Sequence, residues 1–181
     1  MESLATKIAI KIKNSNPEET YSVDVMKYSL GIILNTSFVF LVSMLLGYLS
    51  GRFTETLVLF FAFITLRLCS GGYHFQTARS CNIVSILIFT ITPHLSNYSN
   101  HTLLIINVFC LIIMILFSPT PDRNTQIPIR WYPYLKAASI SLVLLNYWLQ
   151  SPVIGLAFLA QSITIIFTLV RRKDIYEEES R

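Results

Sequence analysis

The feature that most constrains this chain is a run of 20 uncharged and mostly apolar residues, Leu30–Leu49. A helix of this length covers the roughly 30 Å hydrocarbon core of a bilayer. The composition agrees, because 53% of the residues are hydrophobic, only 13% are charged and the mean hydropathy is +0.57. Soluble domains carry about 25% charged residues. The sequence therefore predicts an integral membrane protein.

Five further apolar segments follow the first one. They are Thr54–Leu66, Asn82–Leu95, Thr102–Phe117, Tyr134–Leu149 and Pro152–Val170. The second reaches spanning length only if it continues to about Cys69, and Pro93 should kink or end the third. Short connections such as Gln150-Ser151 predict antiparallel hairpins. We expect an all-α polytopic membrane protein with about six transmembrane helices. A four-span arrangement, with the second and third segments re-entrant, is the alternative.

The basic residues predict the sidedness of these spans. With a cytosolic N-terminus, the outer segments hold only Arg52. The cytosolic segments hold Lys7, Lys11, Lys13, Lys27, Arg67, Arg79, Arg123, Arg130, Lys136, Arg171, Arg172 and Lys173. This distribution is what the positive-inside rule requires. We expect one unit over residues 1–181 in the cell membrane, with both termini cytosolic. Residues 1–28 form a cytosolic or interfacial segment, 29–170 the bundle and 171–181 a cytosolic tail.

The N-terminal segment Glu2–Lys13 predicts a short amphipathic helix before the first span. Its apolar stripe contains Leu4, Ala5, Ile8, Ala9 and Ile12, with Lys7 and Lys11 beside it. Such a helix suits the inner membrane surface. A frayed polar terminus is the alternative, because Ile10 lies off the stripe.

The polar segment between the second and third apolar runs carries the chemistry. It includes His74 and Cys81, and an imidazole and a thiol are the groups that a cysteine nucleophile and its base require. A straight helix would separate these two residues by roughly 10.5 Å along its axis. The segment must therefore bend if they are to meet, and Gly71-Gly72 supplies the backbone freedom.

The start of the third span bears on the same thiol. If that helix begins near Ala78, Cys81 lies in its first turn, where the helix dipole and Arg79 favour a thiolate. The alternative is that His74 caps a helix at the interface and that Cys81 is a small packing residue.

The remaining cysteines and histidines fit the site less well. Cys69 lies on the far side of the glycines, and Cys110 lies among apolar residues in mid-span. His94 and His101 flank the predicted outer loop, across the bilayer from the candidate site. No pair has a metal-ligand spacing such as HExxH or CxxC, so we expect no metal and no cofactor.

The segment from Arg67 through Gly71-Gly72 and His74 to Cys81, in a chain of this length and hydropathy, resembles the accessory gene regulator B (AgrB) family. The basic amphipathic N-terminus and the hydrophobic hairpins extend the resemblance over most of the chain. So does the proline-rich loop that begins at Ser118-Pro-Thr-Pro-Asp122. Members of this family are bacterial membrane cysteine peptidases that process quorum-sensing pro-peptides.

The resemblance implies a role for each residue of the segment. Cys81 would be the nucleophile and His74 its base, with Arg67, Gly71 and Gly72 in supporting positions. The substrate would resemble an AgrD pro-peptide, which loses its acidic C-terminal tail through an acyl-enzyme and closes into a thiolactone or lactone. The resemblance also suggests a homodimer in the lipid bilayer, with no nucleic-acid partner. Weaker candidates for holding the acidic tail are Arg79, Arg123, Arg130 and Lys136, whose placement the topology alone also explains.

Two questions stay open at the level of sequence. A third residue that orients the histidine is not visible in the motif, and the candidates are Asp24, Gln76 and Asp122. The rival functions are a non-catalytic scaffold or peptide-translocating protein, which would not need the thiol of Cys81, and a small transporter. A transporter would carry buried charges in several spans, whereas nearly all charge here lies in loops.

Overall fold

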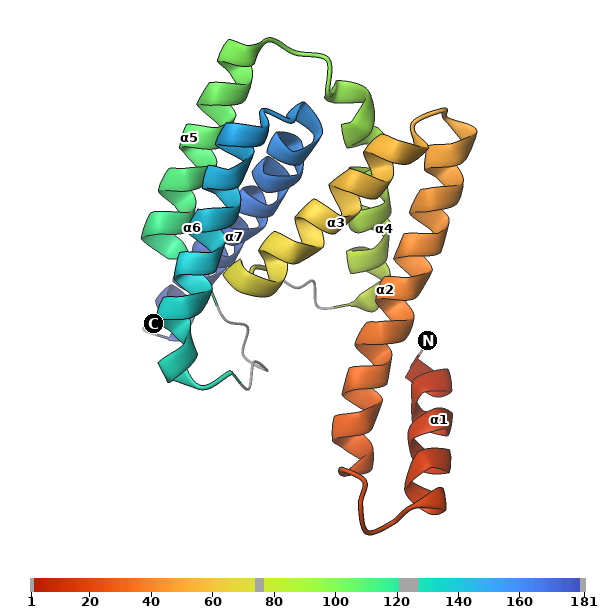
Figure 1. Cartoon of the computed structure of the whole chain (residues 1–181). Coiled ribbons are helices and arrows are strands. Elements are labelled where there is room, and N and C mark those ends of the chain that lie inside the picture. Colours follow the sequence, from red (N-terminus) through yellow and green to blue (C-terminus); the bar gives the residue numbers. More distant parts are fainter. Residues whose placement is uncertain (1, 74–76, 121–126, 180–181) are drawn as a thin grey trace.

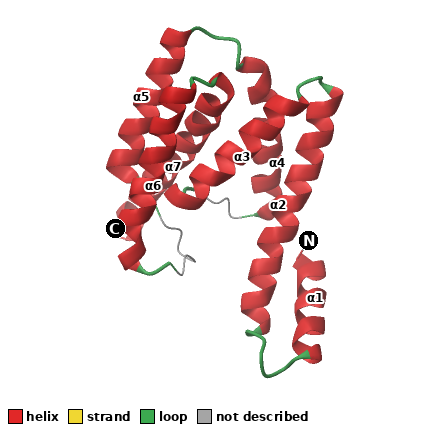
Figure 2. Ribbon diagram, in the orientation of Figure 1, coloured by secondary structure: helices red, strands yellow, loops and turns green. Residues whose placement is uncertain are grey.

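The computed structural model describes residues 2–73, 77–120 and 127–179, and its described part consists of helices (Figures 1 and 2). The long helices are α1 (Glu2–Ser15), α2 (Val23–Leu49), α3 (Phe53–Ser70), α4 (Ala78–Ile91), α5 (Asn100–Phe117), α6 (Tyr132–Leu149) and α7 (Pro152–Glu179). Two single 3₁₀ turns, η1 (Thr92–Leu95) and η2 (Ile129–Trp131), precede α5 and α6. The predicted all-α class is confirmed.

The N-terminal amphipathic helix is present as α1, but it has a protein neighbour. It runs antiparallel along the first half of α2, and this hairpin extends beyond the other helices (Figure 1). The small side chains of Ala5 and Ala9 are buried there, whereas Leu4 and Ile12 remain exposed. Part of the apolar stripe therefore packs on α2, and the other part forms an exposed apolar edge. The axis of α1 is roughly parallel to that of α2.

Four helices in the described part of the chain are long and apolar enough to cross a membrane: α2, α3, α5 and residues 152–170 of α7. The second predicted run thus reaches spanning length, because α3 continues to Ser70. The third and fifth predicted runs, α4 and α6, are not among these four helices. Helix α4 has only 14 residues and passes into η1 at Pro93, as the proline predicted. Helix α6 has 18 residues but includes Lys136 and Asn146.

Helix α3 lies between two groups of helices. It packs against α2 and α4 on one side and against α6 and α7 on the other, while α5 packs on α6 and α7 (Figure 1). Its buried side chains Leu59, Phe60, Phe63 and Leu66 form the centre of the core. The residues of α3 that follow this apolar stripe therefore emerge where both groups of helices meet.

The chain reverses direction at each connection from α2 to α7. The connections 50–52, 96–99 and 150–151 lie at one end of the bundle (Figure 1). The end of α3, the start of α4, residues 118–120, the start of α6 and the last turns of α7 lie at the other. The predicted antiparallel hairpins are confirmed, and the segment with the candidate chemistry lies at the second end.

Candidate active site

The Gly71-Gly72 turn ends α3 in a backbone conformation that favours glycine. The φ angles are +72° at Gly71 and +132° at Gly72. A Cβ atom on Gly71 would lie 2.1 Å from the carbonyl oxygen of Thr120, and one on Gly72 would lie 2.7 Å from Oγ1 of Thr164. Both positions therefore exclude side chains, which is a structural reason for the two glycines in the motif.

The turn is joined to the segment after α5, which is far from it in sequence. The Thr120 N–H donates to Ser70 O (2.8 Å), and the Gly72 N–H donates to Thr120 O (3.2 Å), so Gly71 and Thr120 form a short parallel bridge. Thr120 Oγ1 also donates to Ser70 O (3.1 Å). This segment begins at the cis peptide bond between Ser118 and Pro119. The proline-rich loop thus contacts the turn directly.

Helix α7 contacts the turn from a second side. Arg67, in the last turn of α3, donates through Nη1 to Gln161 Oε1 (3.3 Å) and Thr164 Oγ1 (3.4 Å), and through Nη2 to the carbonyl oxygen of Tyr73 (2.6 Å). The Tyr73 N–H in turn donates to Thr164 O (3.3 Å). Arg67 was predicted from topology and resemblance. Gln161 and Thr164 were not predicted from the sequence, although polar side chains inside an apolar span indicate a functional or structural role.

Cys81 lies in the first turn of α4. The helix begins at Ala78, as predicted, with Thr77 as its N-cap, whose side chain accepts from the Ser80 N–H (3.2 Å). The Cys81 N–H donates to Thr77 O (3.2 Å), and the side chain is half-buried. A helix N-terminus stabilises negative charge, which suits a cysteine that reacts as an anion.

A cavity of about 590 Å³, here called the Cys81 cavity, lies between α2, α3 and α4. One face of each helix lines it: Cys81, Val84, Ser85, Ile88 and Phe89 from α4, and Phe60, Phe63, Ile64 and Arg67 from α3. The α2 face begins with Asp24, Lys27 and Tyr28 and reaches Val39, while Ala5, Tyr73 and Thr164 complete the wall. The thiol therefore lines a partly open space that three helices build together.

The two ends of the Cys81 cavity differ in polarity. Arg67 lies in the last turn of α3, Cys81 in the first turn of α4, and Asp24 and Lys27 lie near the start of α2. Phe60, Phe63 and Phe89 lie deeper, with ring centroids 5.0 Å apart for Phe60 and Phe89 and 5.3 Å apart for Phe63 and Phe89. Eight helical residues separate Cys81 from Phe89, which corresponds to about 12 Å of depth. The nucleophile candidate therefore lies at the boundary between a charged mouth and an aromatic floor.

Several predicted site residues fall outside the part of the chain that the structure describes. These are His74, Gln76, Asp122 and Arg123. The described backbone reaches Tyr73 and resumes at Thr77, so the histidine follows directly after a residue that α3 and α7 hold. Of the three candidates for orienting it, Asp24 is described and lines the Cys81 cavity.

The remaining candidates are at the surface or away from the thiol. Arg79 and Arg130 are exposed and Lys136 is half-buried. Cys110 is buried on α5 among core residues, as predicted for a packing thiol. His94 and His101 are exposed at the opposite end of the bundle, as expected.

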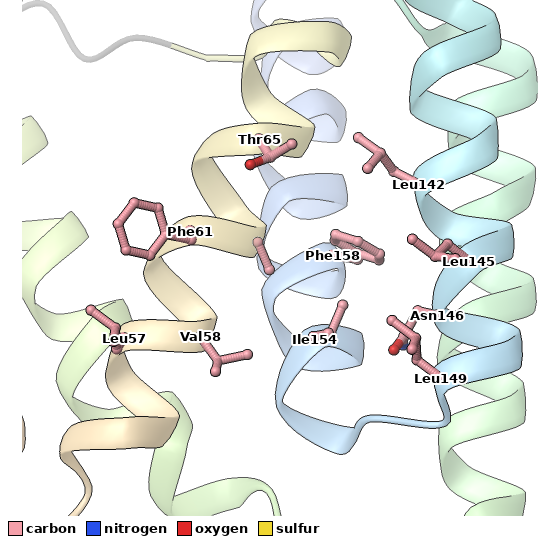
Figure 3. Close-up of a pocket in the computed structure, with 11 residues that line it drawn as sticks. Leu57, Val58, Phe61, Thr65, Leu142, Leu145, Asn146, Leu149, Ile154 and Phe158 are labelled. Carbon is pink, nitrogen blue, oxygen red and sulfur yellow. The ribbon is translucent and has the colours of Figure 1, made fainter.

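A second cavity, of about 380 Å³, lies between α3, α6 and α7 (Figure 3). Leu57, Phe61, Leu142 and Phe158 are typical of its lining, and Thr65 and Asn146 are its polar residues. None of its lining residues is a cysteine or histidine. Of these two cavities, only the Cys81 cavity is lined by a cysteine.

Comparison with known proteins agrees with this arrangement. The family model described as accessory gene regulator B matches residues 5–170. The accessory gene regulator protein B of Staphylococcus intermedius is 28% identical over 145 residues, which cover 77% of this chain and 76% of that protein. Its counterpart from Staphylococcus aureus (strain JH9) is 26% identical over 161 residues, 82% of this chain and 85% of that protein.

Other relatives match over a shorter region. An AgrB-like protein of Halalkalibacterium halodurans is 32% identical over 102 residues, 55% of this chain. The protein FsrB of Enterococcus faecalis is 28% identical over 107 residues, 58% of this chain. The chain spans about half the length of these two relatives, 52% and 44% respectively. No solved structure matches the chain. Since the family model covers nearly the whole chain, this protein belongs to the accessory gene regulator B family of quorum-sensing membrane proteins.

Proposed function

We propose that this chain is a membrane-embedded cysteine endopeptidase that removes the C-terminal tail of an AgrD-like pro-peptide and promotes its cyclisation. The observation that carries the proposal is the position of Cys81. It lies at a helix N-terminus and lines the same cavity as Arg67 and Tyr73, the last described residue before His74. Membership of the family supports the same reaction.

The proposed reaction has two stages. His74 takes the proton of the Cys81 thiol, and the thiolate attacks the carbonyl carbon before the acidic tail. The C–N bond then breaks, the tail amine receives the proton from His74, and the substrate remains as a thioester on Cys81. A thiol or hydroxyl within the peptide next attacks this thioester, closes a thiolactone or lactone, and releases the Cys81 thiol.

The Cys81 cavity gives a physical basis for cyclisation over hydrolysis. An acyl-enzyme yields a ring only if an internal nucleophile reaches it before water does. The aromatic floor formed by Phe60, Phe63 and Phe89 supplies apolar surroundings for substrate residues next to the thioester. The charged mouth holds Lys27 and Arg67 together with Asp24, and its two basic side chains suit the acidic side of the scissile bond. Arg79, Arg123, Arg130 and Lys136 are proposed to attract the tail.

We propose that six helices cross the bilayer and that both termini are cytosolic. Helix α4 and η1 together extend about 29 Å and α6 about 27 Å, close to the thickness of the hydrocarbon core. The end of the bundle with the Gly71-Gly72 turn holds most of the basic residues, which the positive-inside rule places in the cytosol. The protein is then a single multi-pass unit of the bacterial cell membrane, with a second copy of itself as a proposed partner.

The test uses a substrate that cannot close its ring. The short reading frame expected beside this one would encode the pro-peptide, and its ring-closing Cys or Ser is replaced by Ala. This substrate should still lose its tail and should accumulate on Cys81 as a thioester that hydroxylamine cleaves. His74→Ala should block formation of the adduct. Release of free linear acid with no adduct at any time would show a simple hydrolase, and an intact substrate would favour a scaffold or translocating protein.

A further inference from the structure

The amide of Gln161 is the most densely bonded side chain between α7 and the turn. The residue is fully buried, within the apolar part of α7. Its Nε2 donates to Ser70 Oγ (2.9 Å) and to the carbonyl oxygen of Gly71. Its Oε1 accepts from Arg67 Nη1 (3.3 Å) and from Thr164 Oγ1 (3.2 Å). One side chain thus provides hydrogen-bond partners for polar groups at the end of α3 and in the Gly71-Gly72 turn.

These contacts are expensive to lose at this depth. A buried polar group left without a partner costs about 1–3 kcal/mol, and water is scarce within the hydrocarbon region. Without Gln161, the Gly71 carbonyl oxygen and the Ser70 hydroxyl oxygen would each lose a donor. Gly71 is held on its other side by Thr120, so the turn is fixed between α7 and the segment after α5.

The path of the chain toward His74 follows from the same contacts. Tyr73 is the last described residue before the histidine, and its backbone is bonded at both ends: its N–H to Thr164 O and its carbonyl oxygen to Arg67 Nη2. Arg67 is itself bonded to Gln161. Residues 70–73 therefore leave α3 in a direction that α7 determines.

We propose that Gln161 is a positioning residue for the thiol chemistry: it holds Arg67 and the Gly71-Gly72 turn, and through them the backbone of Tyr73, which leads into the histidine. This inference rests on the proposed function, in which His74 is the base. Gln161 touches neither the thiol nor the scissile bond, and it acts through the turn.

A buried amide pair elsewhere in the bundle provides a matched control. Asn146 Nδ2 donates to Asn107 Oδ1 (3.0 Å), also between helices and also buried, but on the α5–α6 side and away from the turn. Asn146→Leu removes an interhelical amide contact of the same kind. A loss of stability common to any such contact will appear in this variant as well.

The experiment measures the rate at which iodoacetamide alkylates Cys81 as a function of pH. It uses the full chain in membranes, with each cysteine quantified separately by mass spectrometry. A nearby imidazolium keeps a thiolate reactive at lower pH, so His74→Ala should move the profile to higher pH. Gln161→Met, which keeps the side-chain length without hydrogen-bonding groups, should move it in the same direction. Ser70→Ala removes one partner of Gln161 and should give a smaller shift.

Tail cleavage gives a second readout. The kcat of Gln161→Met should fall about 10- to 100-fold with KM nearly unchanged. This loss is part of the 10²–10⁴-fold rate enhancement that a positioned general base supplies. Asn146→Leu should keep the wild-type alkylation profile and kcat. If His74→Ala shifts the profile and Gln161→Met does not, or if Asn146→Leu shifts it equally, the inference is overturned and the proposed function stands. If neither His74→Ala nor Gln161→Met shifts it, the assignment of the base falls, and the inference falls with it.

Discussion

At the scale of single residues, two glycines with similar positive φ angles have opposite surroundings. Gly71 has a φ of +72° and Gly51 a φ of +69°. A Cβ atom would lie 2.1 Å from Thr120 O at the first position, whereas nothing lies within 4 Å at the second. Comparison of the two therefore contrasts an uncrowded glycine of positive φ with one at which a ψ of −147° and a close neighbour both disfavour a side chain.

We expect Gly71→Ala to abolish tail cleavage and Gly51→Ala to leave it near the wild-type level. Both variants place a side chain at a positive φ, which costs about 1–3 kcal/mol, and Gly71, with its ψ of −147°, lies in a region that is essentially restricted to glycine. Only the variant at Gly71 must also displace Thr120 and break the bridge between the turn and the segment after α5. In-cell cleavage, normalised to the amount of protein in the membrane, measures the difference. Equal activity of the two variants would contradict a tightly packed turn.

A second residue-scale prediction concerns the nucleophile. Cys81→Ala should abolish both tail release and covalent trapping of the peptide, because no other cysteine lines the Cys81 cavity. Cys69→Ala and Cys110→Ala should remain largely active. Cleavage and adduct formation are followed together by mass spectrometry. An inactive Cys69→Ala variant, or an active Cys81→Ala variant, would move the chemistry to another thiol.

At the scale of helices, polar side chains inside apolar segments fix the neighbours of each helix. Asn146 joins α6 to α5 through Asn107, and its Oδ1 also accepts from the N–H of Ser151 (3.3 Å) in the connection to α7. Gln150 adopts a left-handed conformation there, with a φ of +52°. One side chain therefore fixes both a helix pair and a two-residue connection.

Asn146→Leu should lower the midpoint of thermal unfolding in detergent. A hydrogen bond between membrane helices contributes about 0.6–2 kcal/mol, and Asn107 would be left without its partner. Asn107→Leu/Asn146→Leu should recover part of the loss, because neither buried amide is then unsatisfied. A double variant less stable than Asn146→Leu would show that packing, and not the hydrogen bond, dominates at this pair.

The elements could be predicted from the sequence more completely than their contacts. The apolar runs gave the helices, Pro93 gave the end of α4, and a start at Ala78 placed Cys81 in the first turn. The partners of the turn could not be predicted, because Thr120 and Gln161 lie 50 and 90 residues away from the groups they bond. Periodicity and local motifs contain no information on which polar group meets which across a bundle.

At the scale of the whole molecule, the alternation of helix direction determines which connections share one end of the bundle. In Figure 1 the connections 50–52 and 96–99 lie at the same end, so α4 returns the chain across the bundle despite its short length. Helix α6 does the same between the segment after α5 and the connection 150–151. An arrangement in which only α2, α3, α5 and α7 cross would reverse the sides of two connections.

Labelling of introduced cysteines distinguishes these arrangements. In a background without Cys69 and Cys81, a membrane-impermeant maleimide should label Asn97→Cys in intact cells. It should label Ile127→Cys only after permeabilisation. With four crossings the two results would be exchanged, because α4 and α6 would no longer carry the chain across the bilayer. The same reagent should leave Cys110 unmodified in either state, since that side chain is fully buried.

The bonds from α7 to the Gly71-Gly72 turn also bear on biosynthesis. Cys81 leaves the ribosome about 80 residues before Gln161 and Thr164, which lie in α7. During synthesis the thiol therefore exists without the contacts that shape its surroundings. We expect the Cys81 thiol of a nascent chain to be unreactive toward the pro-peptide until α7 is inserted. A chain that lacks α7 then cannot trap a pro-peptide.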